Sequence, residues 1–189
     1  MGEKCIYIDL DGVILNSQQK MLERKEQDGF YNHKDKEEFN NYFKLADLNN
    51  EWKYIIEDAE SINNSVEIIK ELEILKKRIA ILTKIHTLYE MKAKIEDLRN
   101  NRKINCPILF VPPGVKKHNV VIPNGQLLID DSKKNIDLWI ENGGVGFLFD
   151  KRITNNTNNK VRSLEFLLKR WIQWKVNYII TLKSHLNKI

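Results

Sequence analysis

Short apolar runs, separated by longer segments with helical spacing, set the expected architecture. Five runs have the length and composition of buried parallel strands, at residues 5–9, 79–83, 107–111, 127–130 and 145–149. Between them, apolar residues recur at helical spacing over 62–77, 85–101 and 132–142. Short buried strands that alternate with helices are typical of parallel α/β sheets. The pattern therefore predicts an α/β fold with a doubly wound, Rossmann-like parallel sheet.

The segment between the first two strands breaks this pattern. Residues 16–60 contain no strand-like run and are rich in charged and aromatic side chains. We expect them to form a small helical cap, inserted after the first strand. The core is then formed by residues 1–15 and 61–150.

The last segment, residues 151–189, is expected to be an accessory to this core. It begins with an Asn-rich polar loop at 151–160, and a helical pattern containing Trp171 and Trp174 runs from Val161 to about Leu186. We expect an amphipathic helix packed on the core, with a dimer interface as the alternative. The oligomeric state itself is not predicted.

The positive charge of the chain is concentrated in that last segment. Residues 151–189 carry nine basic residues and one acid, a net charge of +8, whereas residues 1–150 carry 22 basic and 25 acidic residues, a net charge of −3. A basic tail can mark a nucleic-acid-binding protein. The solvated face of a terminal helix carries the same charge, so nucleic-acid binding is possible but not favoured.

Composition and cysteine use narrow the class further. Of the 189 residues, 42% are hydrophobic and 30% are charged, as is typical of globular proteins. No segment approaches the roughly 18 unbroken apolar residues of a membrane span, and the first apolar run lacks a signal-peptide layout. We therefore expect a cytoplasmic protein without a membrane partner. Cys5 and Cys106 fit no metal-binding spacing and are read as small buried residues.

Two acids one residue apart end the first strand. Asp9 and Asp11 lie in the run IYIDLDG, and side chains at positions i and i+2 of a strand face the same side. Both carboxylates can then face the crevice in which open α/β sheets bind ligands. Such a pair suits a divalent cation, and one member can also act as a nucleophile or an acid.

The other strands end in residues that complement this pair. Thr83 ends the second strand, Lys116 and Lys117 follow the third, and Asp130 and Asp131 end the fourth. The carboxyl ends of parallel strands share one edge of the sheet. A hydroxyl, an ammonium group and several carboxylates around one point match phosphoryl transfer, in which a carboxylate attacks phosphorus and cations stabilise the charge.

The order DxDG, Thr, Lys and DD resembles the haloacid dehalogenase-like (HAD) phosphohydrolase superfamily, over residues 9–131. The resemblance implies that Asp9 is the nucleophile and that Asp11 is the general acid and then the base. It also implies a Mg²⁺ ion held by Asp9, the Asp11 carbonyl, Asp130 and Asp131, with the last two acting directly or through water. An acid at position 11 favours a phosphatase over a dehalogenase.

The same resemblance assigns phosphate binding to Thr83 and to one lysine. Lys116 and Lys117 are adjacent, so only one can point into the site, and the spacing ahead of Asp130 favours Lys117. Asn135 either caps the helix that follows or supports the metal loop, and capping is the favoured role. The four histidines receive no catalytic role; they are His33, His86, His118 and His185.

The place of the insertion bears on the substrate. Asp11 and Thr83 are 72 positions apart, whereas Thr83 and Lys117 are only 34 apart, so the cap follows the first motif. With the IDDS motif and the later Gly-Gly-x-Gly run, this resembles the 5′(3′)-deoxyribonucleotidase branch, which implies nucleoside monophosphates as substrates. The chain departs from that branch at Lys84-Ile85-His86, where a Ser/Pro-rich stretch is usual. The expected substrate contacts are Thr83, Lys84, Lys117, Phe30, Tyr31 and Phe43; Trp52 is a further aromatic in the cap.

The primary hypothesis is therefore a Mg²⁺-dependent nucleotidase that acts on a small phosphorylated substrate through an aspartyl-phosphate. Three alternatives stay open. They are a phosphatase acting on polynucleotide ends or on other small esters, a nucleic-acid-binding protein that uses the basic tail, and a catalytically idle relative.

Overall fold

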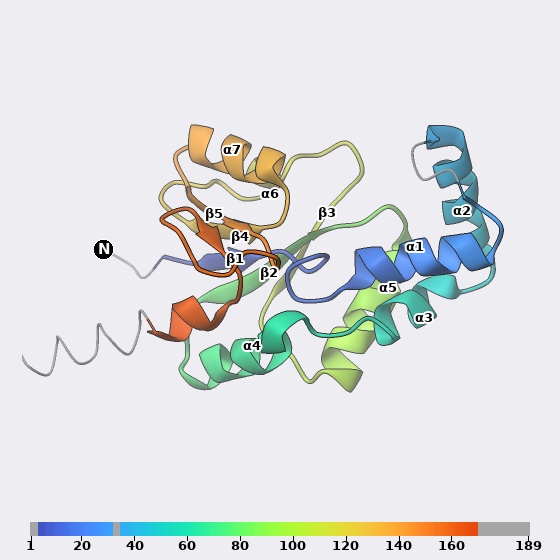
Figure 1. Ribbon diagram of the computed structural model, residues 1–189. Coiled ribbons are helices and arrows are strands. Elements are labelled where there is room, and N and C mark those ends of the chain that lie inside the picture. Colours follow the sequence, from blue (N-terminus) through green and yellow to red (C-terminus); the bar gives the residue numbers. More distant parts are fainter. Residues whose placement is uncertain (1–3, 32–34, 170–189) are drawn as a thin grey trace, which may run out of the picture.

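The centre of the molecule is a six-stranded, all-parallel sheet in the order β3-β2-β1-β4-β5-β6 (Figure 1). The computed structural model describes residues 4–31 and 35–169. The first strand is central, and Ile8 pairs in register with Ile81 on one side and Ile129 on the other. The predicted α/β class is confirmed. The strands are β1 (Ile6–Ile8), β2 (Ile79–Lys84), β3 (Ile108–Val111), β4 (Leu127–Asp130), β5 (Val145–Phe149) and β6 (Lys160–Val161).

Helices cover both faces of this sheet. The helices α6 (Lys117–Val120) and α7 (Lys133–Glu141) lie over one face, and α4 (Ser65–Ile74) and α5 (Leu88–Glu96) lie over the other (Figure 1). A 3₁₀ turn, η1 (Ile62–Asn64), precedes α4, and a π-helical turn, η2 (Asp97–Asn101), extends α5.

Side-chain alternation along the strands divides the apolar interior into two layers. Ile8 and Ile81 belong to the larger cluster, on the side of α4, whereas Leu82 and Leu128 pack with Trp139 of α7 in the smaller one. Both layers form because a parallel sheet covered by helices buries both of its faces.

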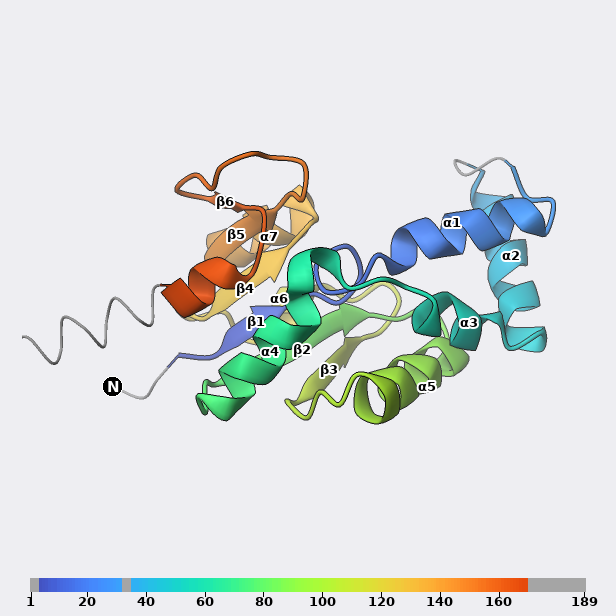
Figure 2. The ribbon, with the colours of Figure 1, turned by 60° about the horizontal axis from the view of Figure 1, so that its bottom comes forward.

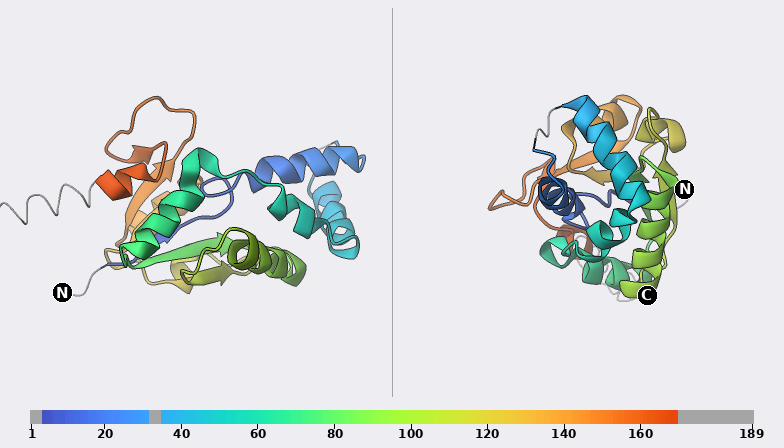
Figure 3. Two further views of the ribbon diagram at one scale, coloured as in Figure 1. Left: turned by 90° about the horizontal axis from the view of Figure 1, so that it is seen from below. Right: turned by 90° about the vertical axis from the view of Figure 1, so that its right-hand side faces the viewer.

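The insertion after β1 is a helical cap, as its sequence pattern predicts. It consists of α1 (Ser17–Gln27), α2 (Lys36–Leu48) and α3 (Glu51–Glu57), which project beyond the carboxyl ends of the strands (Figure 3). The cap leaves and rejoins the core at one place, where Asn16 N–H donates to the Glu60 carbonyl at 2.9 Å and Leu15 forms an antiparallel bridge with Ser61.

Cap and core share one continuous apolar cluster. Tyr42, Trp52 and Ile55 of the cap belong to the same buried group as Ile8 and Ile81 of the sheet. The cap is therefore packed on the core and is not only tethered to it.

The polar segment after β5 differs from the expectation. Lys160 and Val161 were expected to end a loop and begin a helix, but they form β6 at the sheet edge, parallel to β5 (Figure 2). The Asn-rich stretch before them lets the chain cross over, and the Asp150 N–H then donates to the Val161 carbonyl at 2.9 Å. Helical structure resumes only at residue 165.

The start of this last helix packs on the core. Leu164 and Leu167 are buried in the larger apolar cluster, and the ring of Phe166 lies 5.2 Å from that of Phe147. Trp171, Trp174 and most of the predicted basic helix lie outside the described residues.

Among residues 4–31 and 35–169, no helix is both long enough and apolar enough to cross a bilayer.

Candidate active site

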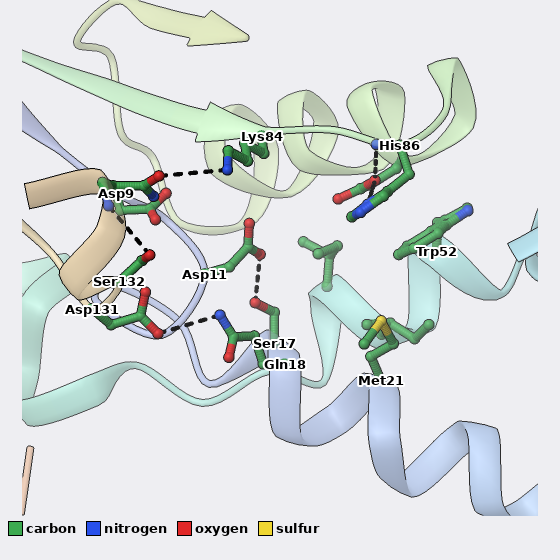
Figure 4. A pocket seen from close by; sticks show the side chains of 14 residues that line it. Asp9, Asp11, Ser17, Gln18, Met21, Trp52, Lys84, His86, Asp131 and Ser132 are labelled. Carbon is green, nitrogen blue, oxygen red and sulfur yellow. Dashed lines mark hydrogen bonds and ion pairs between the residues drawn. The ribbon is translucent and has the colours of Figure 1, made fainter. Parts of the chain in front are cut away.

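A pocket opens where the carboxyl ends of β1, β2 and β4 meet the cap (Figure 4). Its volume is about 230 Å³, which suits a small molecule. Figure 4 shows Asp9 and Asp131 on one side and Met21 and Trp52 on the other, with Asp11 between them. The pocket thus joins an acidic end to an apolar wall.

Lys117 lies between two carboxylates at the acidic end. Its Nζ is 2.8 Å from Asp9 Oδ2 and 2.6 Å from Asp130 Oδ2, and only 2% of its side chain is exposed. Burial acts to lower the pKa of this ammonium group, but the two carboxylates outweigh burial and raise it. Lys117 is therefore a fixed positive charge beside Asp9. Lys116 is the N-cap residue of α6 and is half-buried.

Asp9 is oriented by two donors. Its Oδ1 accepts the Leu10 N–H at 2.8 Å, and its Oδ2 faces Lys117. Burial raises the pKa of this carboxyl well above its usual value, and Asp130 and Asp11 add to that effect although Lys117 opposes it. A further cation beside Asp9 would favour the ionised, nucleophilic form.

The acids around Asp9 can bind such a cation. Asp9, Asp130 and Asp131 each place a ligand atom within 4.8 Å of the others. Burial, with repulsion by Asp130, raises the pKa of Asp131 to about 6. Three carboxylates facing one ammonium group leave a negative site, and oxygen donors are the ligands that Mg²⁺ prefers. The donor set therefore fits a hard divalent cation.

Asn135 holds the carboxylate of Asp130 and does not cap its helix. Ser132 caps α7, because its hydroxyl accepts the Asn135 N–H. The side-chain amide of Asn135 instead lies 3.0 Å from both carboxylate oxygens of Asp130, and the Ser132 N–H donates to Asp130 Oδ1 at 2.8 Å. The favoured capping role was wrong, since the serine at the helix start already fills it.

Asp11 is held by three donors from three elements. Its Oδ1 accepts from the Ser17 hydroxyl of α1 at 2.6 Å. Its Oδ2 accepts from the Thr83 hydroxyl of β2 at 2.9 Å and from Lys94 of α5 at 2.7 Å. Burial acts to raise the pKa of Asp11, but Lys94 and the hydroxyls outweigh burial and lower it. In this state Asp11 is a carboxylate that can accept a proton.

Lys94 is a site residue that the sequence interpretation missed. Its side chain is fully buried, and its Nζ also contacts Glu90 Oε1 at 2.7 Å and the Lys84 carbonyl at 2.8 Å. Burial acts to lower the pKa of this ammonium group, but Asp11 and Glu90 outweigh burial and raise it. The missed signal is spacing. The buried positions of this helix are Glu90, Ala93, Lys94, Asp97 and Leu98, the i, i+3, i+4, i+7, i+8 pattern of a core-facing stripe.

His86 lines the apolar end of the pocket, although no role was predicted for it. Its backbone N–H donates to Glu90 Oε2 at 2.6 Å, and its ring stacks on Phe43 of the cap with 4.4 Å between centroids. Phe43 stacks in turn on Trp52, which lines the pocket. His118 is half-buried outside the pocket lining, and His33 and His185 lie outside the described residues.

The expected substrate contacts are only partly brought together. Lys84 lines the pocket, with its Nζ 3.5 Å from Asn135 Oδ1. Thr83 and Lys117 are buried against Asp11 and Asp9 and do not line the pocket, and neither do the three candidate aromatics. Phe43 is buried in the cap, Phe30 packs edge-to-face on Tyr42, and Tyr31 is 73% exposed. Phe43 and Phe30 pack in the small core of the cap, and Trp52 is the cap aromatic that lines the pocket.

Comparison with solved structures identifies the architecture. A HAD-family enzyme from Bacteroides thetaiotaomicron, solved with magnesium and inorganic phosphate, has a TM-score of 0.55 at 15% identity, over 83% of this chain and 98% of that one. A HAD-superfamily hydrolase from Ehrlichia chaffeensis has a TM-score of 0.54 at 13% identity, over 92% and 98%. The chain has the HAD fold. No protein-family model matches it, and no curated protein does.

A third neighbour supports the same assignment of the fold. The family IA, variant 3 HAD hydrolase from Entamoeba histolytica has a TM-score of 0.55 at 12% identity, over 84% of this chain and 92% of that one. Within the HAD fold, the four predicted motifs of this chain lie at the ends of β1 and β2, after β3, and at the end of β4. The three neighbours are hydrolases of the HAD family or superfamily, and their likeness to this chain does not assign it to the 5′(3′)-deoxyribonucleotidase branch.

Proposed function

We propose that the protein is a Mg²⁺-dependent phosphomonoesterase that works through a phosphorylated Asp9. The observation that carries this proposal is the position of Asp9, held against Lys117 at the head of a pocket that also exposes Asp11 and Asp131. A carboxylate aligned by a buried ammonium group, with a metal site beside it, is equipped to attack a phosphate ester.

In the first step, an Asp9 carboxylate oxygen forms a bond to phosphorus while the bond from phosphorus to the ester oxygen breaks. The departing oxygen takes a proton from Asp11. Lys117 stabilises the charge on the transferring phosphoryl group, and the Thr83 hydroxyl orients Asp11. The incoming phosphate adds negative charge beside Asp11, which favours the protonated form that this step requires.

In the second step, water attacks the phosphoryl group on Asp9. Asp11, now a carboxylate, removes a proton from the water as its oxygen bonds to phosphorus. The bond from phosphorus to Asp9 breaks, so inorganic phosphate and the free carboxylate are released. The hydroxyls of Ser17 and Thr83 hold Asp11 at the position that both steps use.

The metal site fits beside this machinery. Asp9, Asp130 and Asp131 would hold Mg²⁺, which would supply charge neutralisation between the anionic nucleophile and the anionic ester. Hydrogen bonds from the Asn135 amide and the Ser132 N–H orient the Asp130 carboxylate. Such outer contacts commonly fix a metal ligand in its binding orientation.

The apolar end of the pocket favours an ester with a flat group, and we propose nucleoside monophosphates. Met21, Trp52 and Ile55 form a wall opposite the acids, and the pocket lining at this end also includes His86. Aromatic side chains contact flat rings well by stacking.

The direct test is Mg²⁺-dependent release of phosphate from a panel of 5′- and 3′-nucleoside monophosphates, sugar phosphates and 3′-phosphorylated oligonucleotides. We expect nucleotides to be the best substrates and Asp9→Asn to abolish turnover. Asp137→Asn, on the exposed face of α7, is the matched control and should stay active. Activity retained in Asp9→Asn would refute the mechanism, whereas a preference for sugar phosphates would refute only the substrate.

A nucleic-acid substrate rests on a segment that the structure describes only in part. Four of the nine basic residues invoked for it lie beyond residue 169, and no contact in the described part of the chain favours it. The oligonucleotide in the panel tests it directly.

A further inference from the structure

The buried pair of Lys94 and Glu90 is not used by the chemistry above. Lys94 does not line the pocket, and its side chain is fully buried. Its Nζ reaches Asp11 Oδ2 at 2.7 Å, and Glu90 Oε1 lies 2.7 Å away on the other side. A buried ammonium group is costly unless it is paired, so this arrangement ties the two carboxylates firmly to one point.

The contacts of Lys94 fix where Asp11 points. Its Nζ also lies 2.8 Å from the Lys84 carbonyl and 3.3 Å from the Thr83 hydroxyl. These partners belong to β2, a strand in the middle of the sheet, so the ammonium group is anchored to rigid backbone. Asp11, by contrast, lies in the turn after β1. Lys94 therefore holds a loop carboxylate against a fixed frame.

Glu90 connects this pair to the pocket wall. Its Oε1 faces Lys94, while its Oε2 accepts the His86 N–H at 2.6 Å and lies 3.1 Å from the ring Nδ1. His86 in turn stacks on Phe43 of the cap. The carboxylate of Glu90 is thus held from the pocket side as well, and both ends of the ion pair are fixed.

We propose that Lys94, with Glu90 as its counter-ion, is a positioning residue that aims Asp11 at the leaving oxygen of the substrate. This inference rests on the proposed function, in which Asp11 gives a proton to that oxygen. A group that positions the proton donor matters most when the leaving oxygen is strongly basic. It matters little when the leaving group is a stable anion that departs without a proton.

The test compares two esters under Mg²⁺ saturation. One is an alkyl phosphate, the best nucleoside monophosphate, and the other is para-nitrophenyl phosphate, whose leaving group is weakly basic. The value measured is kcat/KM, because it covers the steps up to departure of the leaving group. Asp11→Asn provides the benchmark for complete loss of the proton donor.

We expect Lys94→Met to lower kcat/KM for the alkyl ester by about 100-fold, the scale of a misplaced catalytic group, and for the aryl ester by less than about fivefold. The double variant Lys94→Met/Glu90→Gln removes both buried charges, so it should fold even if the single variant does not. It should show the same selective loss. Lys92→Met, at an exposed position on the same helix, is the matched control.

The outcomes distinguish a failure of the positioning role of Lys94 from a failure of the proposed phosphatase function. An equal loss on both esters, or no loss on either, in a folded double variant would overturn the positioning role while leaving the phosphatase intact. If the wild-type protein hydrolyses neither ester with Mg²⁺, the proposed function fails and this inference fails with it.

Discussion

Gly12 and Asp131 approach so closely that a Cβ on residue 12 would overlap Asp131 Oδ2. Gly12 also has a φ of +81°, in the left-handed region that favours glycine. Glycine is therefore required in the turn after Asp11 for two reasons. The backbone is left-handed there, and the Asp131 carboxylate occupies the space that a Cβ would need.

Gly12→Ala should damage the site more than the fold. The added Cβ should displace the Asp131 carboxylate, and we expect phosphatase activity to fall more than about tenfold. The backbone strain, about 1 kcal/mol, should lower Tm by about 2–4 °C. Gly29→Ala is the control, because Gly29 has a φ of +85° with no neighbour within 4 Å of the added Cβ. If both variants lose activity equally, crowding at Asp131 is not the cause.

Lys117→Met should be severe in both activity and stability. It leaves Asp9 and Asp130 buried without their cation, which costs about 3–5 kcal/mol when one partner of a buried pair is removed. Turnover should fall more than about 100-fold, because the charge that faces the phosphoryl group is lost. Thermal unfolding and kcat measure the two effects. The free energy of unfolding of Lys116→Met, the neighbouring variant, should stay within about 0.5 kcal/mol of wild type. A loss of turnover in Lys116→Met as large as in Lys117→Met would contradict the assignment of Lys117 as the site lysine.

Asn135→Ala should weaken metal binding more than chemistry. The variant removes the amide that holds both oxygens of Asp130, and loss of such an outer contact typically costs about 10–100-fold in metal affinity. We expect a higher Mg²⁺ concentration for half-maximal activity, with kcat largely recovered at saturation. Asn142→Ala, whose amide only bonds the Leu138 carbonyl near the end of the same helix, should leave the Mg²⁺ requirement unchanged.

The Cys106 thiol should be almost inert in the folded protein. Burial raises its pKa to about 12, and the negative charge of Glu73 adds to the effect. A thiol pKa about three units above the unfolded value leaves roughly 10³-fold less thiolate near pH 8. Alkylation by iodoacetamide, followed by mass spectrometry, should therefore mark Cys106 only after unfolding in urea. Rapid native labelling at Cys106 would contradict the burial.

The same shift has a consequence for stability, with a defined sign. A folded-state pKa above the unfolded one stabilises the protein fully below the unfolded value, here 9.0. That contribution is lost as the pH rises from about 9 towards 12. Cys106→Ala should reduce the fall in Tm over this alkaline range.

The sequence predicted the sheet because its strands are continuous apolar runs bounded by polar residues. It missed β6, since Lys160 and Val161 form a strand of only two residues beside an Asn-rich stretch. Such a strand is determined by the edge of the existing sheet and not by its own propensity.

The acids and Thr83 were predictable because each lies at a strand end, where topology brings distant residues together. Lys94 was not, since Glu90 and Lys94 resemble an ordinary surface pair at i and i+4. In this helix Ile95 is 37% exposed while Lys94 is fully buried, the reverse of what hydrophobicity indicates. The pairing of Lys94 with Asp11 and Glu90 explains why it is buried, and the spacing of residues 90, 93, 94, 97 and 98 is the one sequence signal for it.

The joining point of the cap, where Asn16 meets Glu60 and Leu15 meets Ser61, has an evolutionary consequence. A segment whose two ends are adjacent can be lengthened, shortened or replaced without changing the path of any core strand. The acids and the lysine beside Asp9 come from the core, whereas Trp52 comes from the inserted segment. Under the proposed function, selection can therefore alter which ester is accepted by exchanging one contiguous stretch of sequence, while the residues assigned to bond cleavage stay where they are.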